Sequence, residues 1–337
     1  MINKQLLVIT LLSVSLSVFG QKQFSLSQAL DYAKVHNYDV KLSEYDVANA
    51  KAIVKETIGS GLPQINASAD YQNFVTVAST PLPAELTGGT PGEFVPVKFN
   101  PKQSMGASLD AGQLIFDGSY LVGLKASKEV VHLFELQLEK SEIENLKLVA
   151  DAYYTVLVAE KNVDILQRSI GVLKSLVIET DALYNAGFAS ETDASQVKIN
   201  LNNIHNNLDY AITQIKLSKL LLKFRMGINL EEEIVLTDDL ETFTSQQPNI
   251  ILEANVPFTE SVNFKLASQN MTLQTLNRKS KQMGYLPSIT GFVSHQQNAF
   301  GNDFNFFQST TPYFPATVFG FSLKVPIFSS FKKHNQI

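Results

Sequence analysis

Apolar residues recur every seven positions through the middle of this chain. In the outgoing series they are Val149, Val156, Val163, Ile170 and Val177, accompanied by Ala152, Ala159, Leu166 and Leu173. In the returning series they are Ala194, Leu201, Leu208, Ile215 and Leu222, accompanied by Val197, Ile204 and Ala211. A seven-residue repeat is typical of left-handed coiled coils, because 3.5 residues per turn keep the apolar seam facing its neighbour. The pattern predicts two long antiparallel helices over residues 118–183 and 191–226.

The segment between the two series has the composition of a tight turn. Gly187 can adopt the left-handed conformation that ends a helix, and Ser190 can cap the next helix with Asp193 three residues further on. Residues 118–227 are therefore predicted to form a helical hairpin. At 1.5 Å per residue its outgoing arm would be roughly 100 Å long.

On both sides of this hairpin the period changes from about 3.6 to two, as expected of strands. Residues 62–117 and 286–328 are each predicted to form a pair of strands joined by a loop. The apolar positions of the four strands are Ile65, Ala67, Ala69 and Tyr71; Met105, Ala107, Leu109 and Ala111; Ile289 after Leu286-Pro287; and Phe319, Phe321, Leu323, Val325 and Ile327. The loop over residues 81–101 is rich in proline and glycine, and residues 298–315 form a shorter polar and aromatic loop.

The two strand pairs belong to an internal repeat. Leu286-Pro287-Ser288-Ile289 matches Leu62-Pro63-Gln64-Ile65 at an offset of about 224 residues, and each motif follows a predicted helix, over 24–61 and 256–285. Residues 228–255 form an acidic connector. Residues 329–337 would begin a second hairpin, which predicts that the chain is truncated at its C-terminus.

The first residues have the features of an export signal. A basic start, an apolar run over residues 6–19 and a small residue before a polar one are typical of a signal peptide over residues 1–20. A transmembrane anchor is the alternative, but the run is shorter than the ~20 residues that a spanning helix needs. The mature protein would be residues 21–337.

Composition narrows the possible functions. The net charge of −5 and the pI of about 5.6 do not indicate a nucleic-acid partner. The chain has no cysteine, which excludes disulfides, thiolate metal sites and cysteine nucleophiles. The five histidines are scattered without carboxylate or metal spacing. We therefore expect no catalytic, cofactor or metal site, and no enzyme.

The alternating strands suit a membrane β-barrel, with lipid on the apolar face and water on the polar face. The alternative is an antiparallel sheet half-buried on a soluble core. Four strands are too few to close a barrel, since known barrels begin at about eight, and open edges cannot lie in lipid. Several chains would have to share one barrel.

Taken together, these motifs resemble those of TolC-type outer-membrane efflux proteins. The resemblance rests on the repeat, the Leu-Pro pairs, the strand exits at residues 115–118 and 326–329, the turn motif at 187–193 and Gly227. It implies a mixed fold of long helical hairpins joined to four strands of a trimeric 12-stranded barrel. It also implies an outer-membrane location in a Gram-negative bacterium, with the helices in the periplasm and docking to a periplasmic adaptor and an inner-membrane pump. Two departures are Tyr38, where the family often has proline after the asparagine, and the missing second hairpin.

The candidate site residues fall into two groups. The first is the hairpin tip, a candidate adaptor contact formed by Gly187, Phe188, Ala189, Ser190 and Asp193. Phe188 could instead fold back onto the helices. The second group is Asp70, Asp110 and Lys324 on the polar strand faces, which would line the pore or merely be solvated.

Two functional hypotheses follow. The first is an outer-membrane exit duct of a tripartite efflux or type I secretion system. The alternative is a periplasmic coiled-coil scaffold or adaptor without a channel.

Overall fold

The computed structural model describes residues 22–245 and 257–337. The expected signal peptide and part of the connector lie outside these residues. The chain divides into two compact units, Met1–Val47 with Glu135–Lys265, and Ala48–Phe134 with Leu266–Ile337. None of the helices in the described ranges combines the length and hydrophobicity required of a bilayer-crossing segment.

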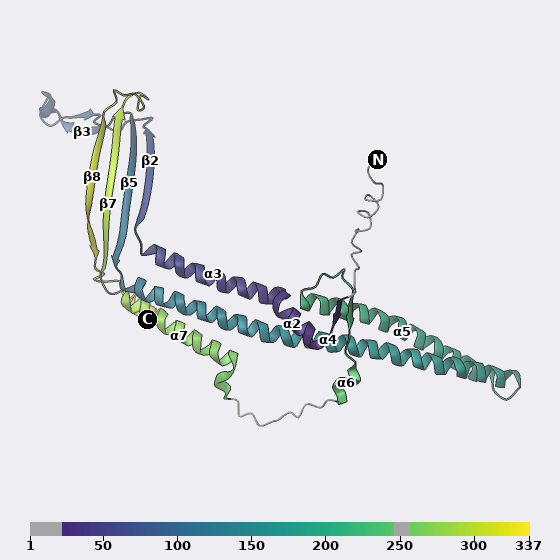
Figure 1. The fold of residues 1–337 in the computed structure, drawn as a ribbon. Coiled ribbons are helices and arrows are strands. Elements are labelled where there is room, and N and C mark those ends of the chain that lie inside the picture. The colour runs from purple at the N-terminus through teal and green to yellow at the C-terminus, as the bar shows by residue number, and fades with distance from the viewer. Residues whose placement is uncertain (1–21, 246–256) are drawn as a thin grey trace, which may run out of the picture. The chain divides into compact units, whose positions relative to one another are not determined.

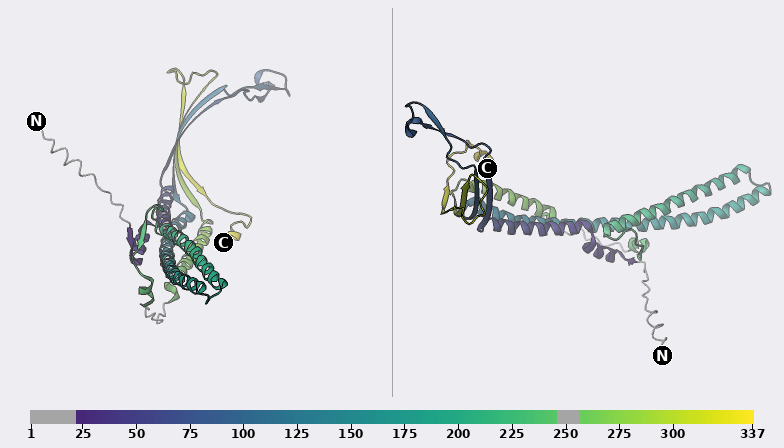
Figure 2. Two further views of the ribbon diagram at one scale, coloured as in Figure 1. Left: turned by 90° about the vertical axis from the view of Figure 1, so that its right-hand side faces the viewer. Right: turned by 90° about the horizontal axis from the view of Figure 1, so that it is seen from above.

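The seven-residue repeat forms the predicted helical hairpin. Helix α4 spans Gly118–Asn185 as one helix of 68 residues, and α5 spans Glu191–Met226. Figures 1 and 2 show α5 returning side by side with the second half of α4. Every apolar position of the two heptad series is buried or half-buried. Ion pairs of 2.9 Å between Lys198 and Asp181 and 2.8 Å between Lys219 and Glu160 connect the two arms.

The N-terminal helical region differs from the prediction, because residues 24–61 do not form one helix. Helix α2 spans Leu26–His36 and α3 spans Tyr38–Ser60. Between them Asn37 takes an extended conformation, with φ −60° and ψ 138°. The apolar spacing continues through this break, so periodicity alone could not locate it.

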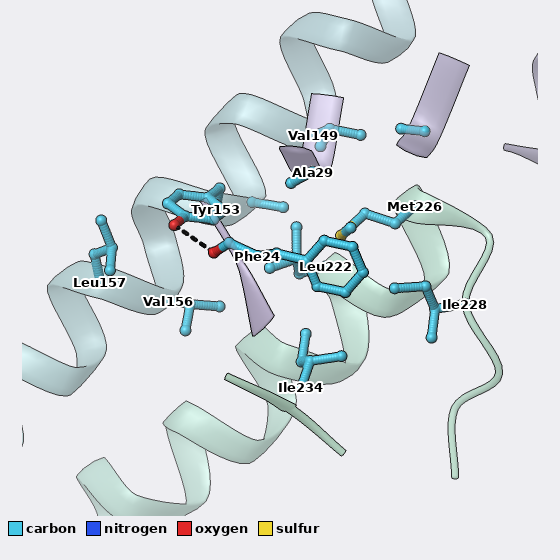
Figure 3. Packing of buried hydrophobic residues seen from close by; sticks show 12 residues of the cluster. Phe24, Ala29, Val149, Tyr153, Val156, Leu157, Leu222, Met226, Ile228 and Ile234 are labelled. Carbon is cyan, nitrogen blue, oxygen red and sulfur yellow. Dashed lines mark hydrogen bonds between the residues drawn. The ribbon is translucent and has the colours of Figure 1, made fainter. Parts of the chain in front are cut away.

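A small sheet and a compact core lie at the base of the hairpin. Strand β1, Lys22–Phe24, pairs in parallel with β6, Ile234–Leu236, inside the segment predicted as a connector. Helix α6, Leu240–Ser245, follows β6, and the 3₁₀ turn Phe258–Glu260 precedes α7, Val262–Met283. Figure 3 shows the core, in which the Tyr153 hydroxyl donates a hydrogen bond to the Phe24 carbonyl at 3.0 Å.

The second unit contains a four-stranded antiparallel sheet. Its strands are β2, Gln64–Asn73; β5, Gln103–Phe116; β7, Ser288–Gly301; and β8, Tyr313–Lys324. Their order is β2-β5-β7-β8, as Figure 1 shows. The predicted loop over residues 298–315 is shorter in the structure, because β7 extends to Gly301 and β8 begins at Tyr313. Ladder hydrogen bonds join backbone groups, so pairing continues past the point where side-chain alternation ends.

The loop over residues 81–101 contains a hairpin of its own. Strand β3, Thr80–Pro83, pairs with β4, Phe94–Val97, and a 3₁₀ helix over Ala84–Thr87 follows β3. The Glu85 carboxylate accepts a hydrogen bond of 2.8 Å from the Gly92 backbone N–H. Gly88 and Gly92 have φ values of 81° and 92°, so these glycines provide the left-handed conformation that the turns of this loop require.

Strand register places like residues on like faces of the sheet. Ile65 pairs with Ala111, which pairs with Val293, which pairs with Phe319, and all four share one face. On the other face Asn66 pairs with Asp110, which pairs with Ser294. The sheet thus has an apolar face and a polar face, as the alternation predicted.

Candidate functional site

The hairpin tip is closed by a hydrogen-bonded glycine turn. Gly187 has a φ of 79°, as predicted. Its backbone N–H donates to the Tyr184 carbonyl at 2.9 Å, and the Phe188 N–H donates to the Leu183 carbonyl at 2.9 Å. These two bonds form a Schellman motif, which satisfies carbonyls that the end of α4 would otherwise leave unpaired.

Ser190 and Asp193 begin the returning helix with a reciprocal capping box. The Asp193 N–H donates to the Ser190 hydroxyl at 3.1 Å, and the Ser190 N–H donates to the Asp193 carboxylate at 3.1 Å. The Ser190 hydroxyl also donates to that carboxylate at 2.6 Å. These hydrogen bonds favour the ionised form and lower the pKa of the Asp193 carboxyl.

Phe188 is presented to solvent at this turn. Its side chain is 82% exposed, and the alternative that it folds back onto the helices is therefore wrong. Ala189 beside it is half-buried. The turn holds an aromatic ring outward on a hydrogen-bonded backbone, which is a geometry suited to contact with another protein.

Each arm of the hairpin carries a second apolar series outside the internal seam. On α4 the series is Val158, Ile165 and Val172, and on α5 it is Tyr210, Leu217 and Phe224. All six are spaced by seven residues within their helix and are 52% to 74% exposed. A helix with two apolar seams is patterned for neighbours on two sides. These seams are therefore candidate contacts with further helices.

The polar sheet face holds the three predicted pore residues, at separate levels. Asp110 lies in a hydrogen-bonded network: its carboxylate accepts from the Ser108 hydroxyl at 2.7 Å and from the Ser294 hydroxyl at 2.5 Å. Asp70, which pairs with Gly106, lies nearer than Asp110 to the strand ends that carry the loops. Lys324, which pairs with Ser288, lies at the opposite end of the sheet. The three residues share a face without forming one cluster.

The base of the hairpin contains a junction that the sequence did not reveal. The buried Asn37 side chain donates to the Arg225 carbonyl at 2.6 Å and accepts from the Asp39 and Val40 N–H groups at 2.7 and 3.1 Å. It thus caps α3 and also holds the end of α5. Gly227, with a φ of 74°, lies so close that a Cβ there would clash with the His36 carbonyl.

Asp238 is a second residue that the sequence did not single out. Its carboxylate accepts from the Leu26 N–H at 2.7 Å and lies 3.0 Å from the Tyr153 hydroxyl, whose single proton it shares with the Phe24 carbonyl. Burial, reinforced by this carboxylate, raises the pKa of Tyr153 well above its ordinary value. Tyr153 is therefore a structural hydrogen-bond donor at neutral pH. In the described residues no group of three or more His, Asp or Glu side chains is arranged to hold a metal ion.

Comparison with known proteins connects these features to a family. The family model described as outer membrane efflux protein matches residues 29–227, which is more than half of the chain. Comparison with curated protein sequences finds no match.

Several solved outer-membrane proteins share the fold. The CmeC outer membrane channel of Campylobacter jejuni aligns with a TM-score of 0.66 at 16% identity, over 92% of this chain and 63% of CmeC. VceC of Vibrio cholerae gives 0.62 at 15% identity, over 92% and 70%. The open MtrE channel of Neisseria gonorrhoeae gives 0.60 at 13% identity, over 92% and 65%. This chain thus spans about two thirds of their length, and it belongs to the outer membrane efflux protein family, with the TolC-type fold of long helices joined to a β-sheet.

Proposed function

We propose that the protein is the outer-membrane exit duct of an efflux system, in which three copies complete one barrel. The observation that carries this proposal is the two-faced, open sheet of a family located in the outer membrane. Strands β2 and β8 end the described sheet, and an unpaired edge is not tolerated in lipid. Three copies of four strands supply twelve, above the roughly eight that known barrels require.

The outer surfaces of the helices support the same assembly. The exposed seams of α4 and α5 would pack against helices of neighbouring copies and continue the wall of the duct into the periplasm. The apolar sheet face would contact lipid, and the polar face with Asp110 would line the water-filled lumen. A periplasmic scaffold without a channel would have to bury the apolar sheet face, yet Phe319 and Phe321 are 79% and 76% exposed.

Reconstitution in planar bilayers of the full-length protein, including the second hairpin expected after residue 337, tests the duct. We expect discrete conductance steps from a particle with the mass of three chains. Asp110→Lys should shift the reversal potential toward anions, and Asp110→Asn should shift it less, because lysine replaces a ring of three carboxylates with three ammonium groups and asparagine only removes the charge. A conducting particle whose selectivity ignores both substitutions would remove Asp110 from the lumen, and a non-conducting monomer would overturn the duct itself.

The tip is the proposed contact with a periplasmic adaptor, which in turn reaches an inner-membrane pump. A photo-reactive phenylalanine analogue placed at Phe188 should crosslink to a protein of the adaptor class. The matched position is Tyr210, 74% exposed on α5, which should crosslink to a second copy of this chain. Crosslinks from both positions to the same protein would contradict the assignment of the tip to an adaptor and of the α5 seam to a second copy of this chain.

A further inference from the structure

The apolar face of the sheet has a polar interruption in its middle. His295 pairs with Thr317 across β7 and β8, and Gln297 lies two residues further along β7 on the same face. The imidazole Nδ1 of His295 lies 2.7 Å from the Thr317 hydroxyl oxygen, and its Nε2 lies 3.5 Å from the Gln297 amide nitrogen. On the neighbouring strand the residue paired with His295 is Leu109. Polar side chains on a lipid-facing surface are costly, so their presence in this row requires a reason.

The hydrogen-bond chemistry of this cluster leaves two groups available to a ligand. The Gln297 amide nitrogen can only donate, so the His295 Nε2 facing it accepts and Nδ1 carries the proton. Nδ1 then donates to the Thr317 oxygen, and the Thr317 hydroxyl proton can be donated outward. The Gln297 amide oxygen can accept. The cluster therefore offers one donor and one acceptor without a net charge, which fits an amide or ester carbonyl beside a hydroxyl better than a bare phosphate.

An apolar hollow of about 340 Å³ adjoins the cluster, on the side toward the helices that enter the sheet. Its floor is Gly291, and its walls include Ile115, Val293, Phe319 and Phe321. A Cβ at Gly291 would lie 3.3 Å from Ile115 Cδ1 and 3.5 Å from the Phe321 ring, so glycine keeps this floor open. A hollow of this size is within the range that holds part of a small apolar ligand.

We propose that the hollow and the polar cluster together form a binding site for lipid A of the outer leaflet. One acyl chain would lie over Gly291 between Phe319 and Phe321, and the amide and hydroxyl near its head would bond to Thr317 and Gln297. In the proposed orientation α3, α4 and α7 adjoin the periplasmic ends of the strands, and the cluster lies between the hollow and the strand ends that carry the loops. The head of the bound lipid would therefore point toward the outer surface. The inference rests on the proposed function, in which the apolar face contacts the outer membrane.

The test uses lipid A retained by the purified protein in mild detergent, quantified per chain by mass spectrometry after size exclusion. The double variant Thr317→Val with Gln297→Leu should retain about tenfold less lipid A, as expected for loss of roughly one or two hydrogen bonds. Gly291→Leu, which fills the floor, should lower retention in the same way. Val318→Leu is the matched control, because Val318 lies between Thr317 and Phe319 in sequence and points to the polar face.

Three outcomes would overturn the site. The first is equal retention of lipid A by the wild type, the double variant, Gly291→Leu and Val318→Leu. The others are retention of phosphatidylethanolamine by the wild type at the same level as lipid A, and loss of lipid A in Val318→Leu alone. Bilayer conductance is measured on the same preparations. A variant that conducts normally but has lost lipid A supports the site and leaves the duct intact. A wild-type protein that conducts but retains no lipid A overturns the site without affecting the proposed duct.

Discussion

The two helices of the hairpin end in turns of the same type. The turn after α4 is exposed to solvent, whereas the turn after α5 is packed against the core. Gly187 after α4 and Gly227 after α5 both have left-handed φ, of 79° and 74°. After each glycine the next N–H bonds back to a carbonyl five residues earlier, from Phe188 to Leu183 and from Ile228 to Lys223. Yet Phe188 is 82% exposed, whereas Ile228 is 3% exposed. Identical local chemistry thus serves a free tip and a packed base, and the surrounding contacts decide the role.

The glycines themselves give the largest expected difference. Gly227→Ala places a methyl group against the backbone of His36 and Asn37 in addition to the left-handed strain, and should cost about 4 kcal/mol, near the top of the range for single substitutions. Gly187→Ala meets only the strain, because no atom lies within 4 Å of its Cβ position, and should cost about 1–2 kcal/mol. Thermal unfolding of the detergent-solubilised protein, followed by circular dichroism, measures both. Equal shifts in melting temperature would show that the close approach at Gly227 contributes nothing.

The residues after the glycines should differ in the same direction. Ile228→Ala removes a buried side chain from the core and should cost about 2–4 kcal/mol. Phe188→Ala removes an exposed ring and should leave the melting temperature within error of the wild type. The same pair separates stability from recognition. If the tip contacts an adaptor as proposed, Phe188→Ala should weaken capture of that protein, while Ile228→Ala should not do so in the folded fraction. A large stability loss in Phe188→Ala would mean that the tip aromatic packs on the helices after all.

Asn37 tests what holds the base together. Asn37→Ala removes the cap of α3 and leaves the Arg225 carbonyl without its donor, which should cost about 2–3 kcal/mol. Asn37→Asp keeps the capping oxygen but replaces the donating nitrogen with an oxygen that faces the carbonyl. If Asn37→Asp is as stable as the wild type, the hydrogen bond to the Arg225 carbonyl contributes nothing to stability, and capping of α3 alone accounts for the effect of Asn37→Ala.

The same contrast explains how much the sequence could predict. The hairpin and its tip depend on contacts within a few residues or one heptad, and the structure confirms the left-handed Gly187 and the Ser190 cap. The hydrogen bond from Asn37 to the Arg225 carbonyl joins groups 188 residues apart, which no local pattern encodes. In the sheet, His295 and Gln297 interrupt the apolar and polar alternation of β7. The sequence pattern therefore predicted neither the full length of that strand nor its polar cluster. Contacts between groups far apart in the sequence were the ones that the sequence did not predict.

Substitution of Tyr38 by proline should have a small effect on stability, and it is the one change expected to be stabilising. Tyr38 is the first residue of α3, where proline is favoured because the helix does not use that N–H and φ is already suitable. Asn37 before it has the extended conformation that a residue preceding proline requires. Tyr38→Pro should therefore stabilise the protein by about 0.4–1 kcal/mol by restricting the unfolded chain. Tyr38→Ala is the control for loss of the half-exposed ring, and the comparison is made by the same thermal unfolding. A Tyr38→Pro protein that melts below Tyr38→Ala would show that the backbone at this joint needs freedom that proline removes.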